Sequence, residues 1–335
     1  MARKPENLPH LFRTTIPVPE NPRKIEHTHT ILSIGSCFSE HIALRLKDFL
    51  FRTCINPTGI LYNPASISQA IRAILSGKSY SRKDLFLHEG LWKSFDHHSD
   101  FNGKTPQKSL EKINSAMKEA IICIEKLDVL IITFGTAFVY RKKDTARLVA
   151  NCHRLPNNAF QRSLLSIHEI VTDYTGLFSE LYKRLPGITI IVTVSPVRHL
   201  RDNPHENQVS KSHLISAVYE LESIFSALYY FPSYEILMDE LRDYRFYSDD
   251  MAHPAPIAFD YIREKFLSAC VSKKSRDFIS DYIPVYQAKE HHIKDSSSER
   301  TVRFAQKQIK YIDTLETRYP EISLTGDKEY FSSLL

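Results

Sequence analysis

Two short segments of the sequence carry side chains that could do chemistry together. The first is Gly35-Ser36-Cys37-Phe38, where a hydroxyl and a thiol follow the glycine that ends an apolar run. At the first turn of a helix such a group faces the crevice beyond the strand, and the helix dipole lowers a thiol pKa. We therefore expect Cys37 or Ser36 to act as a nucleophile. The alternative is that Ser36 only caps the helix and Cys37 only fills space in the core.

The second segment runs from Ser248 to Pro254, and in it Asp250 precedes His253 by three residues. A histidine base needs a carboxylate on Nδ1 that fixes its tautomer and stabilises the imidazolium. This spacing allows one loop to deliver both groups. The alternative is a capping aspartate beside a surface histidine, because a DxxH pattern alone is common.

The hydrophobic pattern predicts the elements that position these residues. Continuously apolar runs predict buried strands over residues 30–35, 128–134, 188–194 and 234–238. Amphipathic stretches predict helices over residues 36–50, 65–75, 110–126, 160–185, 210–229 and 255–269. This alternation predicts a three-layer α/β/α domain with a mainly parallel sheet, whose ligands bind beyond the carboxyl ends of the strands.

The composition changes after Cys270. Residues 271–335 are rich in charged side chains and serine, with one long amphipathic helix predicted over about 297–319. We therefore expect a catalytic domain over residues 1–270 and a charged helical appendage over 271–335. The appendage would pack on the domain or on a partner, including a second copy of the chain.

Composition excludes several classes of function. The 335 residues carry a net charge of only +5, spread along the chain, so a nucleic-acid partner is not expected. No apolar run approaches the ~18 residues of a membrane span, and no secretory signal begins the chain. The five cysteines include no CxxC pair, and no HExxH motif is present, so we expect reduced thiols, a cytoplasmic location, no metal and no cofactor.

The order of the two chemical segments resembles that of SGNH (GDSL-like) hydrolases, and the chain resembles the GSCFA family more closely. The similar stretches are Gly35–Ser39, NPTGILYNP at 56–64, TFGTAFVY at 133–140, ANCHRLP at 150–156, TVSPVRHLRD at 193–202 and YEILMDELRDYRFYSDDMAHP at 234–254. The resemblance covers roughly residues 10–270. It implies an SGNH-like, flavodoxin-like fold and acyl transfer on an ester or thioester, with a small molecule or acylated glycan as substrate.

The resemblance also assigns the residues at the first turn. Laid on the Gly-Asp-Ser turn of SGNH enzymes, Gly35 falls on the glycine and Cys37 on the nucleophile, with Ser36 as the alternative nucleophile. Gly59 falls on the second glycine, whose backbone N–H would contribute to an oxyanion hole.

One expected donor is missing. Gly135-Thr136-Ala137 stands where the family pattern has an asparagine, and an alanine side chain donates no hydrogen bond. Thr136, Asn63 or Asn151 could replace that donor. The departure puts ordinary esterase turnover in doubt.

Three further side chains are candidates for substrate binding. His98 could line the pocket, and Arg198 and His199 could bind an anion on the substrate; a surface histidine and a salt-bridged strand exit are the alternatives. The sequence thus predicts an esterase-type hydrolase or an acyltransferase. The alternative is a non-catalytic SGNH-like module that binds a ligand or serves as a scaffold.

Overall fold

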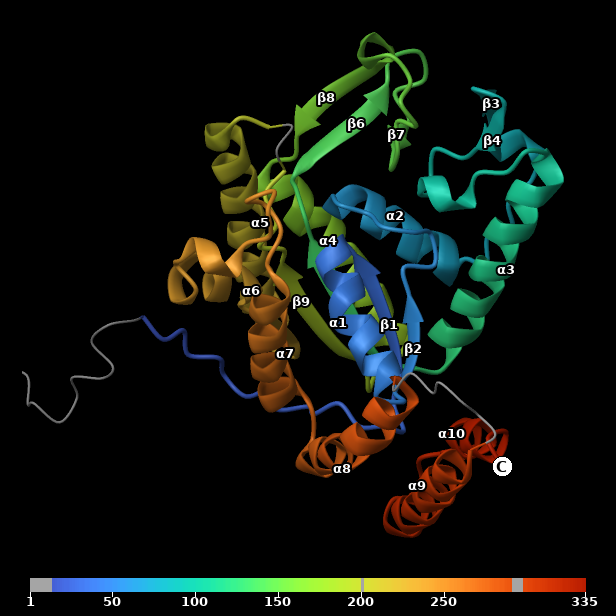
Figure 1. The fold of residues 1–335 in the computed structure, drawn as a ribbon. Coiled ribbons are helices and arrows are strands. Elements are labelled where there is room, and N and C mark those ends of the chain that lie inside the picture. Colours follow the sequence, from blue (N-terminus) through green and yellow to red (C-terminus); the bar gives the residue numbers. More distant parts are fainter. Residues whose placement is uncertain (1–13, 200–201, 291–297) are drawn as a thin grey trace, which may run out of the picture.

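The computed structural model describes residues 14–199, 202–290 and 298–335. At its centre is a five-stranded parallel sheet with the strand order β10-β9-β5-β1-β2 (Figure 1). The strands are β1 (Thr30–Gly35), β2 (Arg52–Ile55), β5 (Leu127–Phe134), β9 (Thr189–Val194) and β10 (Leu228–Phe231). Counted among themselves along the chain, they lie in the order 2-1-3-4-5, which is the flavodoxin-like order.

Helices cover both faces of this sheet, so the predicted three-layer α/β/α fold is confirmed (Figure 1). One face is covered by α2 (Pro64–Leu75), α3 (Pro106–Glu125), α4 (Ile167–Arg184) and α5 (Pro204–Ile224). The other face is covered by α1 (Cys37–Asp48) and α7 (Pro256–Cys270).

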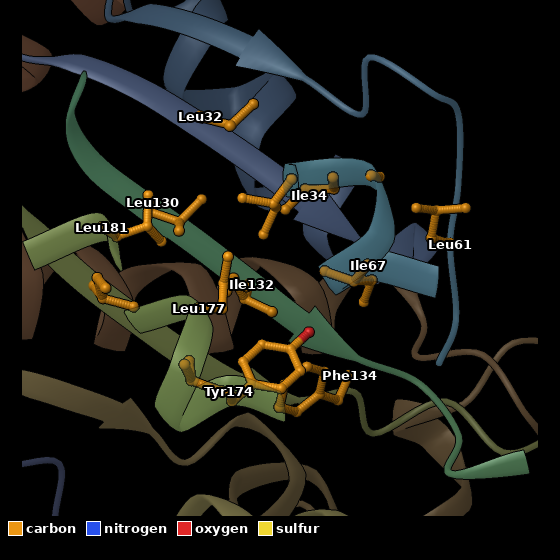
Figure 2. Close-up of a cluster of buried hydrophobic side chains, with 14 of the residues drawn as sticks. Leu32, Ile34, Leu61, Ile67, Leu130, Ile132, Phe134, Tyr174, Leu177 and Leu181 are labelled. Carbon is orange, nitrogen blue, oxygen red and sulfur yellow. The ribbon is translucent and has the colours of Figure 1, made fainter. Parts of the chain in front are cut away.

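Alternate residues of each strand face opposite layers. Figure 2 shows Leu130 and Ile132 of β5 among side chains of the α2–α4 layer, including Tyr174 and Leu177. Their neighbour Ile131 belongs to the second hydrophobic cluster, on the α1–α7 face. Because both faces are buried, the central strands β1, β5 and β9 are apolar on both faces rather than at every second position only.

The C-terminal region consists of α8 (Lys273–Glu290), α9 (Glu299–Arg318) and α10 (Thr325–Ser332), where the sequence predicted one long helix. Ile312 and Leu315 of α9 are buried in the same cluster as Phe266 of α7. The apolar face of α9 therefore packs against α8 and α10 and is part of the hydrophobic cluster that continues to the α1–α7 layer. The division into two domains and an oligomer through this helix stay predictions.

The strand predicted over residues 234–238 was wrong. The fifth strand is β10, whose first two residues fall at the end of the predicted helix over 210–229. Helical turns follow it: α6 (Ser233–Glu235) and a π-helical turn over Ile236–Glu240. Three of the four β10 residues (Leu-Tyr-Tyr-Phe) are aromatic, a composition that favours a strand. Pro232 then cannot donate to a ladder and ends it.

The single helix predicted over residues 160–185 was also wrong at its start. Residues Phe160–Leu164 form β8, which pairs with β6 (Phe138–Lys142) and, through it, with β7 (Leu148–Val149). The helix begins after Ser166, whose Oγ accepts a hydrogen bond from Glu169 N at 3.2 Å in a capping box.

This antiparallel sheet extends beyond the carboxyl end of β5, and a hairpin of β3 (Phe86–His88) and β4 (Leu91–Lys93) belongs to the same end of the molecule (Figure 1). A third cluster of buried residues, Phe95, Val149 and Phe160, holds these small sheets together. Within the described ranges, no helix is both long and apolar enough to cross a membrane.

Candidate active site

The turn after β1 lies where the strand order reverses. From β1 the chain moves to β2 on one side and later to β5 on the other, so the crevice between β1 and β5 is the switch point of the sheet. Gly35 makes the turn with a φ of +143°, and a Cβ there would lie 2.3 Å from Thr133 O. Only glycine fits, because the backbones of β1 and β5 approach too closely for a side chain.

Ser36 and Cys37 follow at the start of α1, as the sequence predicted. Ser36 occupies the N-cap position, yet its hydroxyl makes no capping hydrogen bond, and Oγ is buried without a partner. The capping role considered for this residue is therefore limited to its backbone. Cys37 is partly buried, so its sulfur is the more accessible of the two nucleophiles.

The expectation that the helix dipole lowers the Cys37 pKa was wrong. Burial raises the pKa of this thiol, and backbone N–H groups of the first turn offset only part of the effect. Cys123 is instead the thiol whose pKa is lowered, because the Cys54 thiol donates a hydrogen bond to it. The burial of Cys37 disfavours the thiolate that attack on a carbonyl requires.

Asp250 and His253 form the pair that their spacing predicted. His253 Nδ1 donates to Asp250 Oδ2 at 2.5 Å, and Asp250 Oδ1 accepts from the backbone N–H of His253 at 2.9 Å and of Ala252 at 3.0 Å. These three hydrogen bonds, the backbone ones first, lower the pKa of Asp250 to about 2. The carboxylate thus fixes the tautomer of the imidazole and leaves Nε2 for chemistry.

His253 lines a pocket of about 390 Å³ beside α1, together with His41, Arg45 and Phe259. His41 is one helical turn after Cys37, so the two side chains share a face of α1. The His253 side chain is 49% exposed. Within the described residues, no hydrogen bond joins it to Cys37 or Ser36.

The backbone N–H of Gly59 is already engaged in a hydrogen bond within its own turn. The N–H donates to Asn56 O at 2.7 Å, and a Cβ on Gly59 would lie 2.2 Å from His98 Cβ. The glycine therefore allows the His98 loop to pack closely, and the oxyanion role implied for it stays a prediction that this hydrogen bond disfavours. His98 itself is partly buried, with Nδ1 2.9 Å from Asp100 Oδ2.

The three replacements proposed for the missing asparagine have structural partners of their own. Asn63 caps α2, with Oδ1 accepting from Ser66 N at 2.8 Å. Thr136 Oγ1 lies 3.0 Å from Ser210 Oγ on α5, which also accepts from Ala137 N. Asn151 lies by the small sheets, and its Oδ1 accepts from His153 N at 2.8 Å. The contacts of Asn63 and Asn151 use Oδ1 as an acceptor and leave Nδ2 as a donor, so the replacement for the missing asparagine stays a prediction.

Arg198 and His199 lie at the carboxyl end of β9. The His199 ring packs edge-to-face on Tyr62 at 5.0 Å, and its Nε2 lies 3.3 Å from the position of a Cβ on Gly135. Arg198 donates to Met238 Sδ at 3.6 Å, and it has no carboxylate partner within the part of the chain described. Among the described residues, Arg198 therefore forms no ion pair at the end of β9. Its role in binding an anion stays a prediction.

Sequence reasoning missed Lys211. This side chain of α5 is 1% exposed, and its Nζ donates to Gly135 O and to Ser195 O, each at 2.6 Å. A signal was present, because Lys211 falls on the apolar stripe of α5. The stripe consists of Asn207, Lys211, Leu214, Val218 and Leu221, all buried.

Asn56 was also missed. Its Oδ1 accepts from Gly35 N at 2.9 Å, which fixes the amide orientation and holds the turn before Ser36. Its Nδ2 is buried without a partner, as are Thr58 Oγ1 and Thr133 Oγ1. Buried polar atoms are nearly always paired in folded proteins, so such a group around one turn is typical of a ligand site. Over the described ranges, no group of three or more His, Cys, Asp or Glu side chains is placed to hold a metal.

Comparison with known proteins gives a match to a family model and distant likenesses to solved structures. The family model described as the GSCFA family matches residues 30–266. No curated protein matches the chain. A solved structure from Streptococcus pneumonia, whose description provisionally calls it a platelet activating factor, is 13% identical, with a TM-score of 0.37 over 77% of this chain and 87% of that one.

Proposed function

The chain belongs to the GSCFA family, and from that premise we propose that it is an enzyme of acyl transfer, with Cys37 as its nucleophile. The supporting observation is the turn after β1. There a partly buried thiol begins a helix at the switch point of the sheet, beside unpartnered buried polar atoms. The substrate is an ester or a thioester of a small molecule or an acylated glycan, and the superfamily is that of SGNH-like hydrolases.

The first step is attack of Cys37 Sγ on the carbonyl carbon, and the proton of the thiol passes to a base. His253, oriented by Asp250, is that base and afterwards donates a proton to the leaving group. His253 is exposed and not bonded to Cys37, so this step requires its Nε2 to approach the sulfur when a substrate binds. Water or an acceptor hydroxyl then attacks the thioester and releases the acyl group.

Backbone and amide N–H groups stabilise the oxyanion in this proposal. The N–H groups of Cys37 and Phe38 belong to the first turn of α1, where no helical carbonyl accepts them. Asn56 Nδ2 is a third donor, which takes the part that the resemblance implied for Gly59. Ser36 Oγ is the alternative nucleophile.

A second function has one observation in its favour. His253 makes no hydrogen bond with either nucleophile within the described residues, which suits a binding or scaffold module of the same fold. Such a module would bind an acylated ligand without turnover. It needs neither the thiol nor the imidazole.

Turnover of short-chain aryl esters and acyl thioesters by the full chain tests the proposal. We expect His253→Ala to reduce kcat/KM on the order of 10²- to 10⁴-fold, the usual contribution of a positioned acid–base group. Since His253 is exposed, the melting temperature of the His253→Ala protein should match that of the parent protein. His205→Ala, which changes an exposed histidine at the start of α5, is the matched control. Full activity of the His253→Ala protein contradicts the assignment, and no turnover by the parent favours the binding module.

A further inference from the structure

Lys211 is a buried group to which the proposed reaction assigns no part. Its Nζ lies between the carbonyl oxygens of Gly135 and Ser195, which directly follow β5 and β9. Since β5 is the neighbour of β1, Nζ lies at the same edge of the sheet as Cys37. The placement brings the side chain from α5, on one face of the sheet, to the switch point.

Both partners of Nζ are uncharged. Carbonyl oxygens fix the direction of the amino group without neutralising an ammonium, and no ion pair to Lys211 occurs within the described residues. An ammonium has three N–H groups, of which these two oxygens accept two. One N–H is therefore left for a further acceptor.

The charged groups that face Nζ come from three segments. They are Cys37 at the start of α1, Arg198 after β9 and Asp202 before α5, and the effect of Cys37 is the largest of the three. Asp202 is already paired with Arg162. The ring of Tyr234 on α6 lies 5.9 Å from Nζ.

Burial lowers the pKa of Lys211 to about 7, and the charge of Cys37 acts in the opposite direction. The reciprocal effect is present as well, since Lys211 lowers the pKa of Cys37, but it is the smallest of the effects on this thiol, and burial and Glu40 oppose it. Each ionised partner thus favours the ionised form of the other.

A lysine is a costly way to bind two carbonyl oxygens. Its position on the apolar stripe of α5 would accept leucine or methionine, and burial of an ammonium without a counter-ion costs several kcal/mol. The hydrogen bonds to Gly135 and Ser195 alone do not require a charge. What does require one is a neighbouring group that becomes an anion.

We propose that Lys211 is a positioning residue of the Cys37 site, and that its ammonium stabilises the thiolate of the nucleophile. The inference rests on the proposed role of Cys37. It accounts for how a buried sulfur can ionise, because a fixed cation in a medium of low dielectric offsets the cost of burying the anion. Lys211 would thus stabilise the Cys37 thiolate, which the helix dipole alone does not do sufficiently.

The pH profile of Cys37 alkylation tests this without any substrate. The full chain is treated with limiting iodoacetamide at a series of pH values, and modification is measured by mass spectrometry of the Cys37 peptide. We expect Lys211→Met to move the profile to higher pH and to slow modification near neutral pH about tenfold, which corresponds to one unit of thiol pKa. The profile of Cys152, beside the small sheets, should not move.

Lys93→Met is the matched control, since Lys93 is also buried but pairs with the carboxylate of Glu89 at 3.4 Å. It should leave the Cys37 profile unchanged. If Lys211→Met does not fold, Lys211→Gln keeps amide N–H donors near the two carbonyl oxygens without the charge. A second measurement uses the parent protein and compares two reagents, anionic iodoacetate and neutral iodoacetamide. The ratio of their modification rates should favour iodoacetate more at Cys37 than at Cys152.

An unchanged Cys37 profile in a folded Lys211 variant, or equal reagent preference at the two cysteines, overturns the inference. These outcomes are separate from those of the proposed function. If turnover requires Cys37 but the alkylation profile of Cys37 is unchanged in the Lys211 variants, only the inference is contradicted. If the alkylation profile of Cys37 shifts in the Lys211 variants but the parent protein has no acyl-transfer activity, only the proposed function is contradicted.

Discussion

The carboxyl end of the sheet and the C-terminal helices differ in the pairing of their most deeply buried polar side chains, since the unpartnered atoms of the helices, Arg276 Nε and Gln308 Oε1, belong to half-buried residues. In the helices, the buried carboxylate of Asp327 accepts hydrogen bonds from Tyr282 Oη at 3.0 Å and Lys289 Nζ at 2.6 Å. At the sheet end, Ser36 Oγ and Asn56 Nδ2 are buried with no partner. The first arrangement stabilises the fold, whereas the second costs free energy that a bound ligand could return.

The backbone shows the same contrast. Gly35 in the turn before Cys37 and Asn56 after β2 both have positive φ, and at Gly35 two strands are in contact through their main chains. The helices α8 to α10 instead add apolar side chains to the second hydrophobic cluster. Changes at the sheet end should therefore affect the site through geometry, and changes in the helices should affect stability alone.

The largest expected effect is that of Gly35→Ala. The new Cβ would lie 2.3 Å from Thr133 O at a φ of +143°, so β1 and β5 would have to separate. We expect a loss of more than about 4 kcal/mol in the free energy of unfolding, measured by urea denaturation. Gly77→Ala, at a positive φ but in open space, should cost only about 1 kcal/mol. Equal losses would show that the strands are not in close contact at Gly35.

Asp327→Asn comes next. The substitution keeps a partner for Tyr282 but removes the charge that pairs with Lys289, so we expect a loss of roughly 2 kcal/mol. Asp313→Asn removes an exposed partner of Lys328 and should cost less than about 1 kcal/mol. Acyl-transfer activity per folded molecule should be unchanged in both. A loss of activity in Asp327→Asn would mean that the helices contribute to the site.

The smallest effect concerns pH and His27. Burial lowers the pKa of His27 to about 4, and its Nε2 lies 3.0 Å from Phe49 O in the neutral ring. Because this pKa lies below that of the unfolded chain, stability from the neutral ring is complete above about pH 6.5 and is lost as the pH falls toward 4. We expect a loss on the order of 1–2 kcal/mol between pH 7 and 5, part of which His27→Phe should remove. The same pH dependence in both proteins would assign the effect to other groups, such as His97.

Much of the fold could be predicted because burial on both faces of the sheet requires a simple hydrophobic pattern in the sequence. The runs at β1, β5 and β9 are mainly apolar on both faces, and the helices between them have one apolar face. The strand β10 was missed because Leu228–Phe231 follows a long amphipathic helix without a glycine or proline to separate them. The short strand β2, with exposed and half-buried residues, carries no such pattern.

The site could be predicted only where its residues are adjacent in the sequence. Asp250 and His253 belong to one loop, and Ser36 and Cys37 to one turn, so local reasoning found both. Lys211 comes from α5 to the edge of the sheet at which Cys37 lies, and that placement exists only after the sheet has formed. Local rules also gave the wrong sign for the Cys37 pKa, since the dipole is a local property and burial is not.

The central claim is that Cys37 carries the acyl group, and the most direct measurement is the mass of the trapped intermediate. The full chain is mixed with a short-chain acyl thioester, quenched in acid and mapped by peptide mass spectrometry. We predict one acyl increment on the peptide that contains Cys37, lost in Cys37→Ala together with turnover. Turnover retained in Cys37→Ala, with the acyl group on Ser36 or on no residue of that turn, would contradict the account.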